Sequence, residues 1–187
     1  MMGPLGNKKI IFITGGARSG KSSFAEDYAA KSGGSVLYIA TALPIDEEME
    51  KRIAYHRKNR PSTWYTVEAY KNIDSILEEI GGSYQAVLLD CLTVMINNLI
   101  FPFWREDLTL SRLSNLENKV MEQLNALLEA SFAGQLIIVS NELGCGLVPD
   151  SPLGRFFRDV AGRANQRVAA KANEVFLLVS GIPMRIK

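Results

Sequence analysis

Residues 10–26 read Ile10-Ile-Phe-Ile-Thr-Gly-Gly-Ala-Arg-Ser-Gly-Lys-Ser-Ser-Phe-Ala-Glu26, an apolar run followed by glycines and then by a helix-forming segment. The spacing Gly15-x-x-x-x-Gly20-Lys21-Ser22 is that of the Walker A loop, in which backbone N–H groups surround a phosphate at a helix N-terminus. Glycine permits the tight turn, Lys21 can reach the β- and γ-phosphates, and the Ser22 hydroxyl can ligate Mg²⁺. The motif therefore predicts a strand, a phosphate loop and a helix over 23–31, with nucleotide contacts from Gly15, Gly16, Ala17, Arg18, Ser19, Gly20, Lys21 and Ser22.

Composition sets limits on the remaining chemistry. The chain has 187 residues, 47% of them hydrophobic, which indicates one domain with a full core. The chain has 21 Lys and Arg and 20 Asp and Glu, so its net charge is close to zero. This net charge gives no reason to expect a nucleic-acid or membrane-surface partner. No apolar run approaches the roughly 20 residues of a membrane span, and residues 1–9 lack the apolar centre of a secretory signal. We therefore expect a flexible leader over 1–9, a domain over 10–187 and a cytoplasmic protein.

Apolar runs alternate with helical periods along the rest of the chain. Continuous apolar runs, typical of strands buried on both faces of a parallel sheet, are followed by amphipathic segments. This alternation predicts an α/β fold of the P-loop type, with an open, mostly parallel sheet, helices on both faces and a short antiparallel C-terminal edge strand. The strands are expected at 10–13, 35–41, 64–70, 86–90, 136–139, 175–179 and 184–187. The helices are expected at 23–31, 45–60, 72–80, 108–132 and 153–173, with a helix or turn at 91–99.

One helix carries a leucine-rich stripe, which predicts packing on the sheet rather than a coiled coil because a strand follows at once. The stripe comprises Leu110, Leu113, Leu116, Val120, Leu124, Leu127 and Leu128.

Polar residues follow the predicted strands, and ligands of open parallel sheets bind at these carboxyl ends. Asp90 ends an apolar strand, where P-loop proteins place the carboxylate that holds Mg²⁺ with the loop hydroxyl of Ser22. The alternative for Asp90 is an N-cap of the following helix. Segments 40–42 and 141–144 follow two other strands, and each is either a ligand contact or an ordinary loop.

His56 is the only histidine, and it lies in His56-Arg57-Lys58-Asn59-Arg60-Pro61 at the end of a predicted helix. A histidine on a charged helix is usually a solvated surface residue. A neutral imidazole is nevertheless available as a nucleophile near neutral pH, and the neighbouring cations would bind phosphates. A row of arginines on a later helix either contacts an anionic ligand or forms a solvated face, and the solvated face is favoured for most of them: Arg155, Arg158, Arg163 and Arg167. Two cysteines with one histidine cannot supply four soft ligands for structural zinc.

These segments resemble one known family over residues 10–187: the bifunctional adenosylcobinamide kinase / adenosylcobinamide-phosphate guanylyltransferases of cobalamin biosynthesis. The P-loop is shared by many families, whereas the His-Arg-x-x-Arg-Pro block and the C-terminal blocks are specific. The matching segments are 15–22, 40–42, 48–53, 56–64, 66–68, 89–93 with 98–99, 140–146, 153–159 with 165–166, and 179–183.

The resemblance implies two reactions at one enzyme: phosphorylation of adenosylcobinamide by ATP or GTP, then transfer of GMP from GTP to that phosphate with release of pyrophosphate. It makes His56 the covalent guanylyl carrier and implies a trimeric assembly. The phosphate loop itself predicts Lys21 as the second catalytic residue, with Mg²⁺ held by Ser22 and Asp90. The implied nucleotide contacts outside the loop are Ala40, Thr41, Ala42, Arg57, Lys58, Asn59, Arg60, Glu68 and Asp90.

Two other functions stay open at this point. One is a P-loop kinase for a different small metabolite, for which His56 would be incidental. The other is a GTP-binding switch, although the chain contains no Asn-Lys-x-Asp guanine motif.

Among the implied nucleotide contacts, the Glu68 carboxylate could accept hydrogen bonds from guanine N1–H and N2–H₂ if it faces the base.

Overall fold

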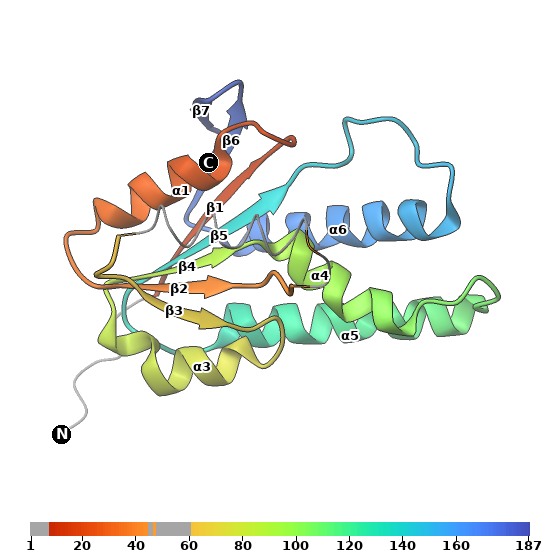
Figure 1. Cartoon of the computed structure of the whole chain (residues 1–187), viewed down its shortest axis with the longest axis horizontal. Helices are drawn as coiled ribbons and strands as arrows, with labels where there is room; N and C mark the ends of the chain where they lie inside the picture. Colours follow the sequence, from red (N-terminus) through yellow and green to blue (C-terminus); the bar gives the residue numbers. More distant parts are fainter. Residues whose placement is uncertain (1–7, 45–46, 48–60) are drawn as a thin grey trace.

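A computed structural model describes residues 8–44, 47 and 61–187 of the chain. In this part, seven strands form one sheet in the order β3-β2-β4-β5-β1-β6-β7 (Figure 1). All neighbouring strands are parallel except β6 and β7, which are antiparallel. The predicted sheet with its antiparallel C-terminal strand is confirmed. The strands are β1 (Lys9–Gly15), β2 (Val36–Ala40), β3 (Tyr65–Glu68), β4 (Ala86–Asp90), β5 (Gln135–Asn141), β6 (Glu174–Val179) and β7 (Ile182–Arg185).

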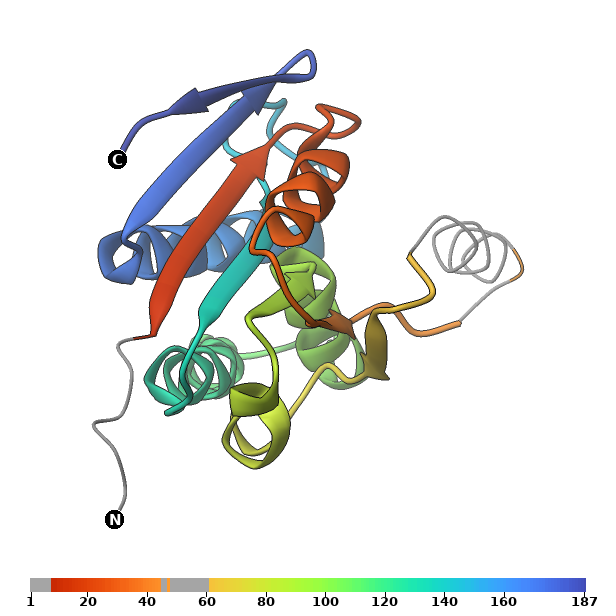
Figure 2. The ribbon, with the colours of Figure 1, turned by 90° about the vertical axis from the view of Figure 1, so that its left-hand side faces the viewer.

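Helices cover both faces of the sheet, as predicted, but unevenly. Among the described helices, α1 packs alone on one face and the other four pack on the opposite face (Figures 1 and 2). None of the described helices is both long and apolar enough to cross a membrane. The helices are α1 (Lys21–Ala30), α3 (Ile73–Ile80), α4 (Leu92–Ile100), α5 (Leu110–Glu129) and α6 (Pro152–Lys171), with short 3₁₀ turns η1 (Gly81–Ser83) and η2 (Phe101–Phe103).

The core consists of two layers separated by the sheet. Strand β2 and the central residues of β4 and β5 are apolar and buried because both faces of these strands are covered. Alternate residues of each strand therefore point into different layers. Ile11 and Ile13 pack toward α1, whereas Ile10 and Phe12 pack toward α3–α6. The continuous apolar runs in the sequence have this physical cause.

The stripe predicted for the long helix is wrong at its start. Leu110 is 83% exposed and Leu113 is only partly buried, whereas the remaining residues of the stripe from Leu116 onward are buried. The first turns of α5 extend past the end of the sheet (Figure 1), so they do not pack on it. The predicted helix 45–60, except residue 47, and residues 1–7 of the predicted leader lie outside the described residues. The predicted leader 1–9 is wrong at its end, because Lys9 is the first residue of β1.

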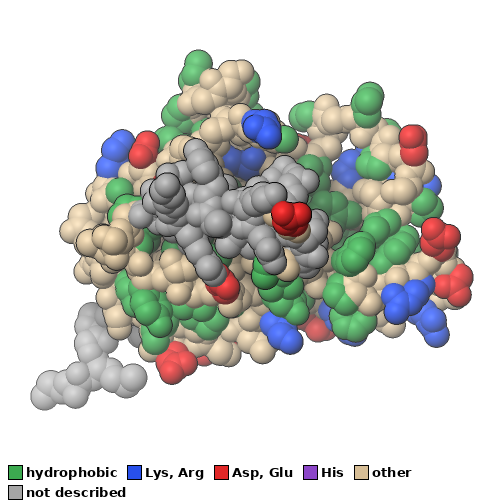
Figure 3. Space-filling model, in the orientation of Figure 1, with side chains coloured by type: hydrophobic (Ala, Val, Ile, Leu, Met, Phe, Trp, Pro, Cys, Tyr) green, Lys and Arg blue, Asp and Glu red, His purple; other side chains and the backbone are tan. Residues whose placement is uncertain are grey.

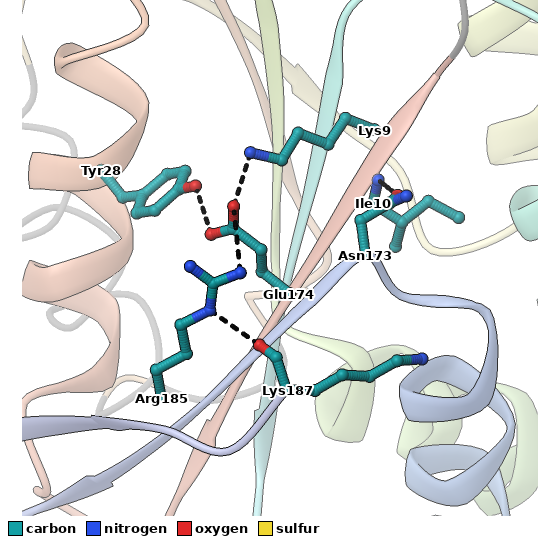
Figure 4. Close-up of polar contacts among 7 residues, drawn as sticks. All are labelled: Lys9, Ile10, Tyr28, Asn173, Glu174, Arg185 and Lys187. Carbon is teal, nitrogen blue, oxygen red and sulfur yellow. Dashed lines mark hydrogen bonds and ion pairs between the residues drawn. The ribbon is translucent and has the colours of Figure 1, made fainter.

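A polar cluster joins the first strand to the last two strands and to α1 (Figure 4). The Glu174 carboxylate pairs with Lys9 Nζ at 2.6 Å, accepts from the Tyr28 hydroxyl at 2.9 Å and lies 3.8 Å from Arg185 Nη2. The hydrogen bond with Lys9 holds the pKa of Glu174 below its usual range. Asn173 accepts through Oδ1 from the backbone N–H of Ile10 at 2.7 Å. The cluster fixes β6 and β7 beside the strand that carries the phosphate loop.

Candidate active site

The loop after β1 needs glycine at two positions. A Cβ on Gly15 would lie 2.6 Å from the carbonyl oxygen of Leu178, so only glycine lets the strand end pass so close to β6. Gly20 has φ +90°, which L side chains rarely adopt, and a Cβ there would lie 3.2 Å from Gly181 Cα. Arg18 also adopts a left-handed conformation, with φ 56°. The chain therefore wraps tightly between β1 and α1, as the Walker spacing predicts.

The N-terminus of α1 presents unsatisfied N–H groups to this loop. Its N-cap is Gly20, no side chain caps it, and its first turn contains no acidic residue. The first N–H groups of a helix have no intrahelical partner, and the helix dipole adds partial positive charge there. An anion bound in the loop would supply both the hydrogen-bond acceptors and the negative charge that this end lacks.

Lys21 lies across the loop that it follows. Its Nζ donates to the carbonyl oxygen of Gly16 at 3.0 Å, and the residue is 8% exposed. Burial lowers the pKa of Lys21, while the nearby Cys91 and Asp90 act in the opposite direction. The ammonium group is therefore partly desolvated and has a single hydrogen bond to the loop, so a phosphate oxygen would be a stronger partner.

Two hydroxyl groups around the loop lack partners. Thr14 Oγ1 and Ser19 Oγ are buried and make no hydrogen bond within the described part of the chain. Buried polar groups are nearly always satisfied, so such groups call for a ligand or water partner. Their position at the end of β1 and within the loop agrees with a polar ligand at this site.

Asp90 ends β4, two strands away from β1. The hydroxyl of Tyr38 donates to Asp90 Oδ2 at 2.9 Å. The N-cap of α4 is Cys91, so the alternative role of Asp90 as an N-cap is wrong. The Asp90 carboxylate raises the pKa of Lys21, against the larger effect of burial, which lowers it.

The oxygen donors present fit Mg²⁺ bound together with a nucleotide. Within the described residues, no group of three or more His, Cys, Asp or Glu could hold a metal by itself. Mg²⁺ usually uses one or two protein oxygens and takes the remaining ligands from phosphates and water. Ser22 in the first turn of α1 and Asp90 across the site are donors of that kind.

Strand register places three predicted site residues in one row. Ala40 pairs with Glu68 on one side and with Asp90 on the other. Glu68 is exposed at the end of the outermost strand, β3. Neighbouring strands are about 4.8 Å apart, so Glu68 lies roughly 19 Å across the sheet from the phosphate-loop strand. A nucleotide that contacts both Glu68 and the phosphate loop must therefore lie along the edge of the sheet formed by the carboxyl ends of its strands.

Thr41 connects two of these strand ends. Its Oγ1 donates to the Cys91 carbonyl oxygen at 2.9 Å and accepts from the Cys91 N–H at 2.8 Å, and the residue is 1% exposed. The Asn98 amide donates to the Thr41 carbonyl oxygen at 2.8 Å. The side chain of Thr41 therefore holds β2 to β4. Ala42, which follows it, is only partly buried.

The structure adds contacts that sequence patterns did not reveal. The N–H of Gly181 in the β6–β7 turn donates to the Ser19 carbonyl oxygen at 2.9 Å. The N–H of Glu142 after β5 donates to the Gly15 carbonyl oxygen at 2.9 Å. Tyr38 holds Asp90, and its only sequence signal is a tyrosine inside an otherwise aliphatic strand. His56 and the predicted contacts Arg57, Lys58, Asn59 and Arg60 lie outside the described residues.

Comparison with known proteins gives a family and close relatives. The family model described as Cobinamide kinase / cobinamide phosphate guanyltransferase matches residues 11–186. The Bifunctional adenosylcobalamin biosynthesis protein CobU of Escherichia coli is 43% identical over 185 residues, covering 95% of this chain and 99% of that protein. CobU of Salmonella typhimurium is 41% identical, with 95% and 99% covered. The corresponding CobP of Pseudomonas aeruginosa is 40% identical, with 94% and 95% covered.

A solved structure supports the fold alone. The chain of a prototypical ATPase from a type III secretion system superimposes with a TM-score of 0.58 at 12% identity. The match covers 91% of this chain and 51% of that chain, so this chain corresponds to about half of it. The likeness confirms the P-loop architecture and says nothing about substrate.

Proposed function

The chain belongs to the cobinamide kinase / cobinamide phosphate guanyltransferase family and is an enzyme of that family, and we propose how its residues divide the two reactions. The phosphate loop with Lys21, Ser22 and Asp90 carries the phosphoryl transfer. His56 carries the guanylyl group. The observation that bears most weight is the uncapped N-terminus of α1 next to the buried Lys21, whose Nζ donates to the Gly16 carbonyl oxygen of the loop.

In the kinase reaction, the hydroxyl oxygen of the acceptor forms a bond to the γ-phosphorus of ATP or GTP. The bond from that phosphorus to the β–γ bridging oxygen breaks, the nucleoside diphosphate leaves, and the hydroxyl proton is released. The loop N–H groups from Gly15 to Ser22 and the Lys21 ammonium would stabilise the charge on the phosphate oxygens. Mg²⁺, held by Ser22 and Asp90, would supply further charge neutralisation.

In the guanylyl reaction, an imidazole nitrogen of His56 forms a bond to the α-phosphorus of GTP, and pyrophosphate leaves. The phosphate of adenosylcobinamide phosphate then attacks the same phosphorus, the P–N bond breaks, and the histidine is regenerated. The sequence context supports this assignment, because Arg57, Lys58 and Arg60 follow the imidazole directly and suit a triphosphate. Asn59, which lies between these cations, is proposed as a further nucleotide contact.

Guanine selection is assigned to Glu68. Its carboxylate ends β3 and is exposed, at the far end of the row formed by Ala40 and Asp90. A carboxylate can accept from both N1–H and N2–H₂ of guanine, an arrangement that adenine cannot match. We also propose that the protein is cytoplasmic. By resemblance to the family we propose that it forms a homo-trimer, and light scattering of the purified protein would measure the mass of that assembly.

The covalent step is tested by incubating the protein with GTP and Mg²⁺. Label in the α-phosphate should become attached to the protein, whereas label in the γ-phosphate should not. The adduct should be acid-labile and base-stable, as expected for a phosphoramidate, and intact mass should rise by one guanylyl group.

The variant His56→Asn should lose the label and the guanylyl transfer together, and the chain offers no second imidazole to replace it. A variant that still takes up α-label would overturn the assignment of His56. Guanylyl transfer by a parent protein that never becomes labelled would overturn the covalent mechanism.

A further inference from the structure

A pocket of about 250 Å³ lies beside the proposed phosphate site, at the carboxyl ends of β2, β4 and β5. Its lining comes from the segment after β2, from α4, from the end of β5 and from α6. Figure 3 shows hydrophobic side chains in the recess below the loop that follows β5. The lining residues are Leu43, Thr93, Val94, Asn97, Asn98, Asn141, Leu143 and Phe157.

Two lining residues of the pocket lie near the ends of the phosphate-loop strand and of β4. Asn141 is the register partner of Gly15, one strand away from the phosphate loop. Thr93 follows Asp90 by three residues, at the start of α4. Since neighbouring strands are about 4.8 Å apart, a group held in the pocket can extend its end to the phosphate held by the loop.

The chemistry of the lining favours a neutral ligand that donates hydrogen bonds. No described lining residue carries a charge, and three carboxamides and one hydroxyl face four apolar side chains. The amide of Asn98 donates to the Thr41 carbonyl oxygen and that of Asn141 donates to Thr93 Oγ1, both at 2.8 Å. These bonds fix the two amides by their NH₂ groups and leave their carbonyl oxygens available as acceptors. Burial of a charged group here would be strongly unfavourable.

We propose that this pocket binds the aminopropanol arm of the corrinoid acceptor, an inference that rests on the proposed function. The arm consists of a secondary amide, a short branched carbon chain and the hydroxyl that is phosphorylated. Its amide N–H donates to the carboxamide oxygen of Asn97, beside the fixed amides of Asn98 and Asn141. Its methyl group packs on Leu43, Val94 and Phe157, and its hydroxyl points toward Asp90 and the phosphate loop.

The volume of the pocket limits how much of the corrinoid it can enclose. Pockets that enclose drug-sized ligands have volumes of about 300–1,000 Å³. A pocket of about 250 Å³ is smaller than that range, so it holds one arm and leaves the macrocycle at the surface. A nucleobase is the competing neutral occupant, but the guanine contact assigned to Glu68 lies on the opposite side of Asp90, on β3.

The test compares two asparagines by steady-state phosphorylation of cobinamide with ATP. Asn97 is partly buried in the pocket, and Asn118 is exposed on α5. The variant Asn97→Leu keeps the size of the side chain and removes its hydrogen bonding. It should raise the KM for cobinamide about tenfold or more, and raise the KM for ATP by much less. The control Asn118→Leu should leave both KM values at the parent level.

If Asn97→Leu does not fold, Asn97→Ala provides the same comparison without added bulk. An unchanged KM for cobinamide, with an active parent, would overturn the pocket assignment alone. A rise confined to the KM for the nucleotide would assign the pocket to the nucleobase and would also overturn it. A parent enzyme that does not phosphorylate cobinamide at all would instead refute the proposed function.

Discussion

Asn165 on α6 holds the end of β5 beside the phosphate loop, and its removal gives a prediction with a definite magnitude. The amide Oδ1 accepts from the Ser140 hydroxyl at 2.7 Å, and Nδ2 donates to the Asn141 carbonyl oxygen at 3.0 Å. Ser140 is fully buried, and Asn141 is the register partner of Gly15. The variant Asn165→Ala removes both bonds and leaves the hydroxyl of Ser140 without an acceptor.

The expected loss of unfolding free energy follows from these contacts. Each hydrogen bond contributes about 1 kcal/mol, and leaving the buried hydroxyl unpaired adds about 1 kcal/mol. Alanine has a higher helix propensity than asparagine, and this difference offsets about 0.5 kcal/mol of the lost unfolding free energy. The net destabilisation of Asn165→Ala is therefore about 2.5 kcal/mol. For a chain of this size it corresponds to a fall in Tm of roughly 5–10 °C.

Urea denaturation of the parent and the variant measures this loss. The control Gln166→Ala changes the next residue of the same helix, which is exposed, and should stay within about 0.5 kcal/mol of the parent. In the double variant Ser140→Ala/Asn165→Ala the shared hydrogen bond is lost once rather than twice, and no hydroxyl is left unpaired. Its destabilisation should therefore be about 2 kcal/mol smaller than the sum of the single changes. Strict additivity, or a loss under 1 kcal/mol for Asn165→Ala, would refute the reasoning.

Three further variants test the site and the fold. Lys21→Met should abolish phosphorylation yet raise the Tm of the nucleotide-free protein, because it removes a desolvated charge; an unchanged phosphorylation rate would contradict the loop assignment. Asp90→Asn should raise the Mg²⁺ concentration needed for half-maximal activity by tenfold or more, and an unaltered requirement would argue against a metal role. Glu174→Gln should lower stability by about 1 kcal/mol at neutral pH. Because the folded-state pKa of Glu174 is lowered, this stabilisation is present above the unfolded-state pKa and disappears as the pH falls through the folded-state value, so parent and variant should converge in acid.

Local patterns predicted most of the elements in the described part of the chain. The strand 86–90 has the predicted bounds, because a run of four apolar residues ends at the charged Asp90. The predicted helix 23–31 starts at Lys21 instead, because the loop itself forms the first turn after Gly20. Leu110 shows the limit of periodicity: the spacing of leucines predicts which side of a helix is apolar, but not where the sheet beneath it ends.

Contacts between distant segments were not predictable from local pattern. The β6–β7 turn reaches the phosphate loop through Gly181 and Ser19, which are far apart in the sequence. The row of Glu68, Ala40 and Asp90 depends on strand order and register, which an apolar run does not encode. The sequence predicted that ligands would bind at the carboxyl edge, whereas the order of the strands decides which side chains meet there.

The position of β5 between β1 and β4 explains how Lys21 and Asp90 can serve the same ligand. Two strand spacings, about 10 Å, separate the phosphate-loop strand from the strand that ends in Asp90. Among the described residues, no ion pair joins Lys21 to Asp90, although the carboxylate influences the pKa of the ammonium. With β4 directly beside β1, the two charges would be close enough to pair, and the ammonium would then lose a strong partner on binding phosphate. Lys21 has one hydrogen bond, to the Gly16 carbonyl oxygen, which a phosphate oxygen can replace, and this is the state that the proposed use of Lys21 and Asp90 on one nucleotide requires.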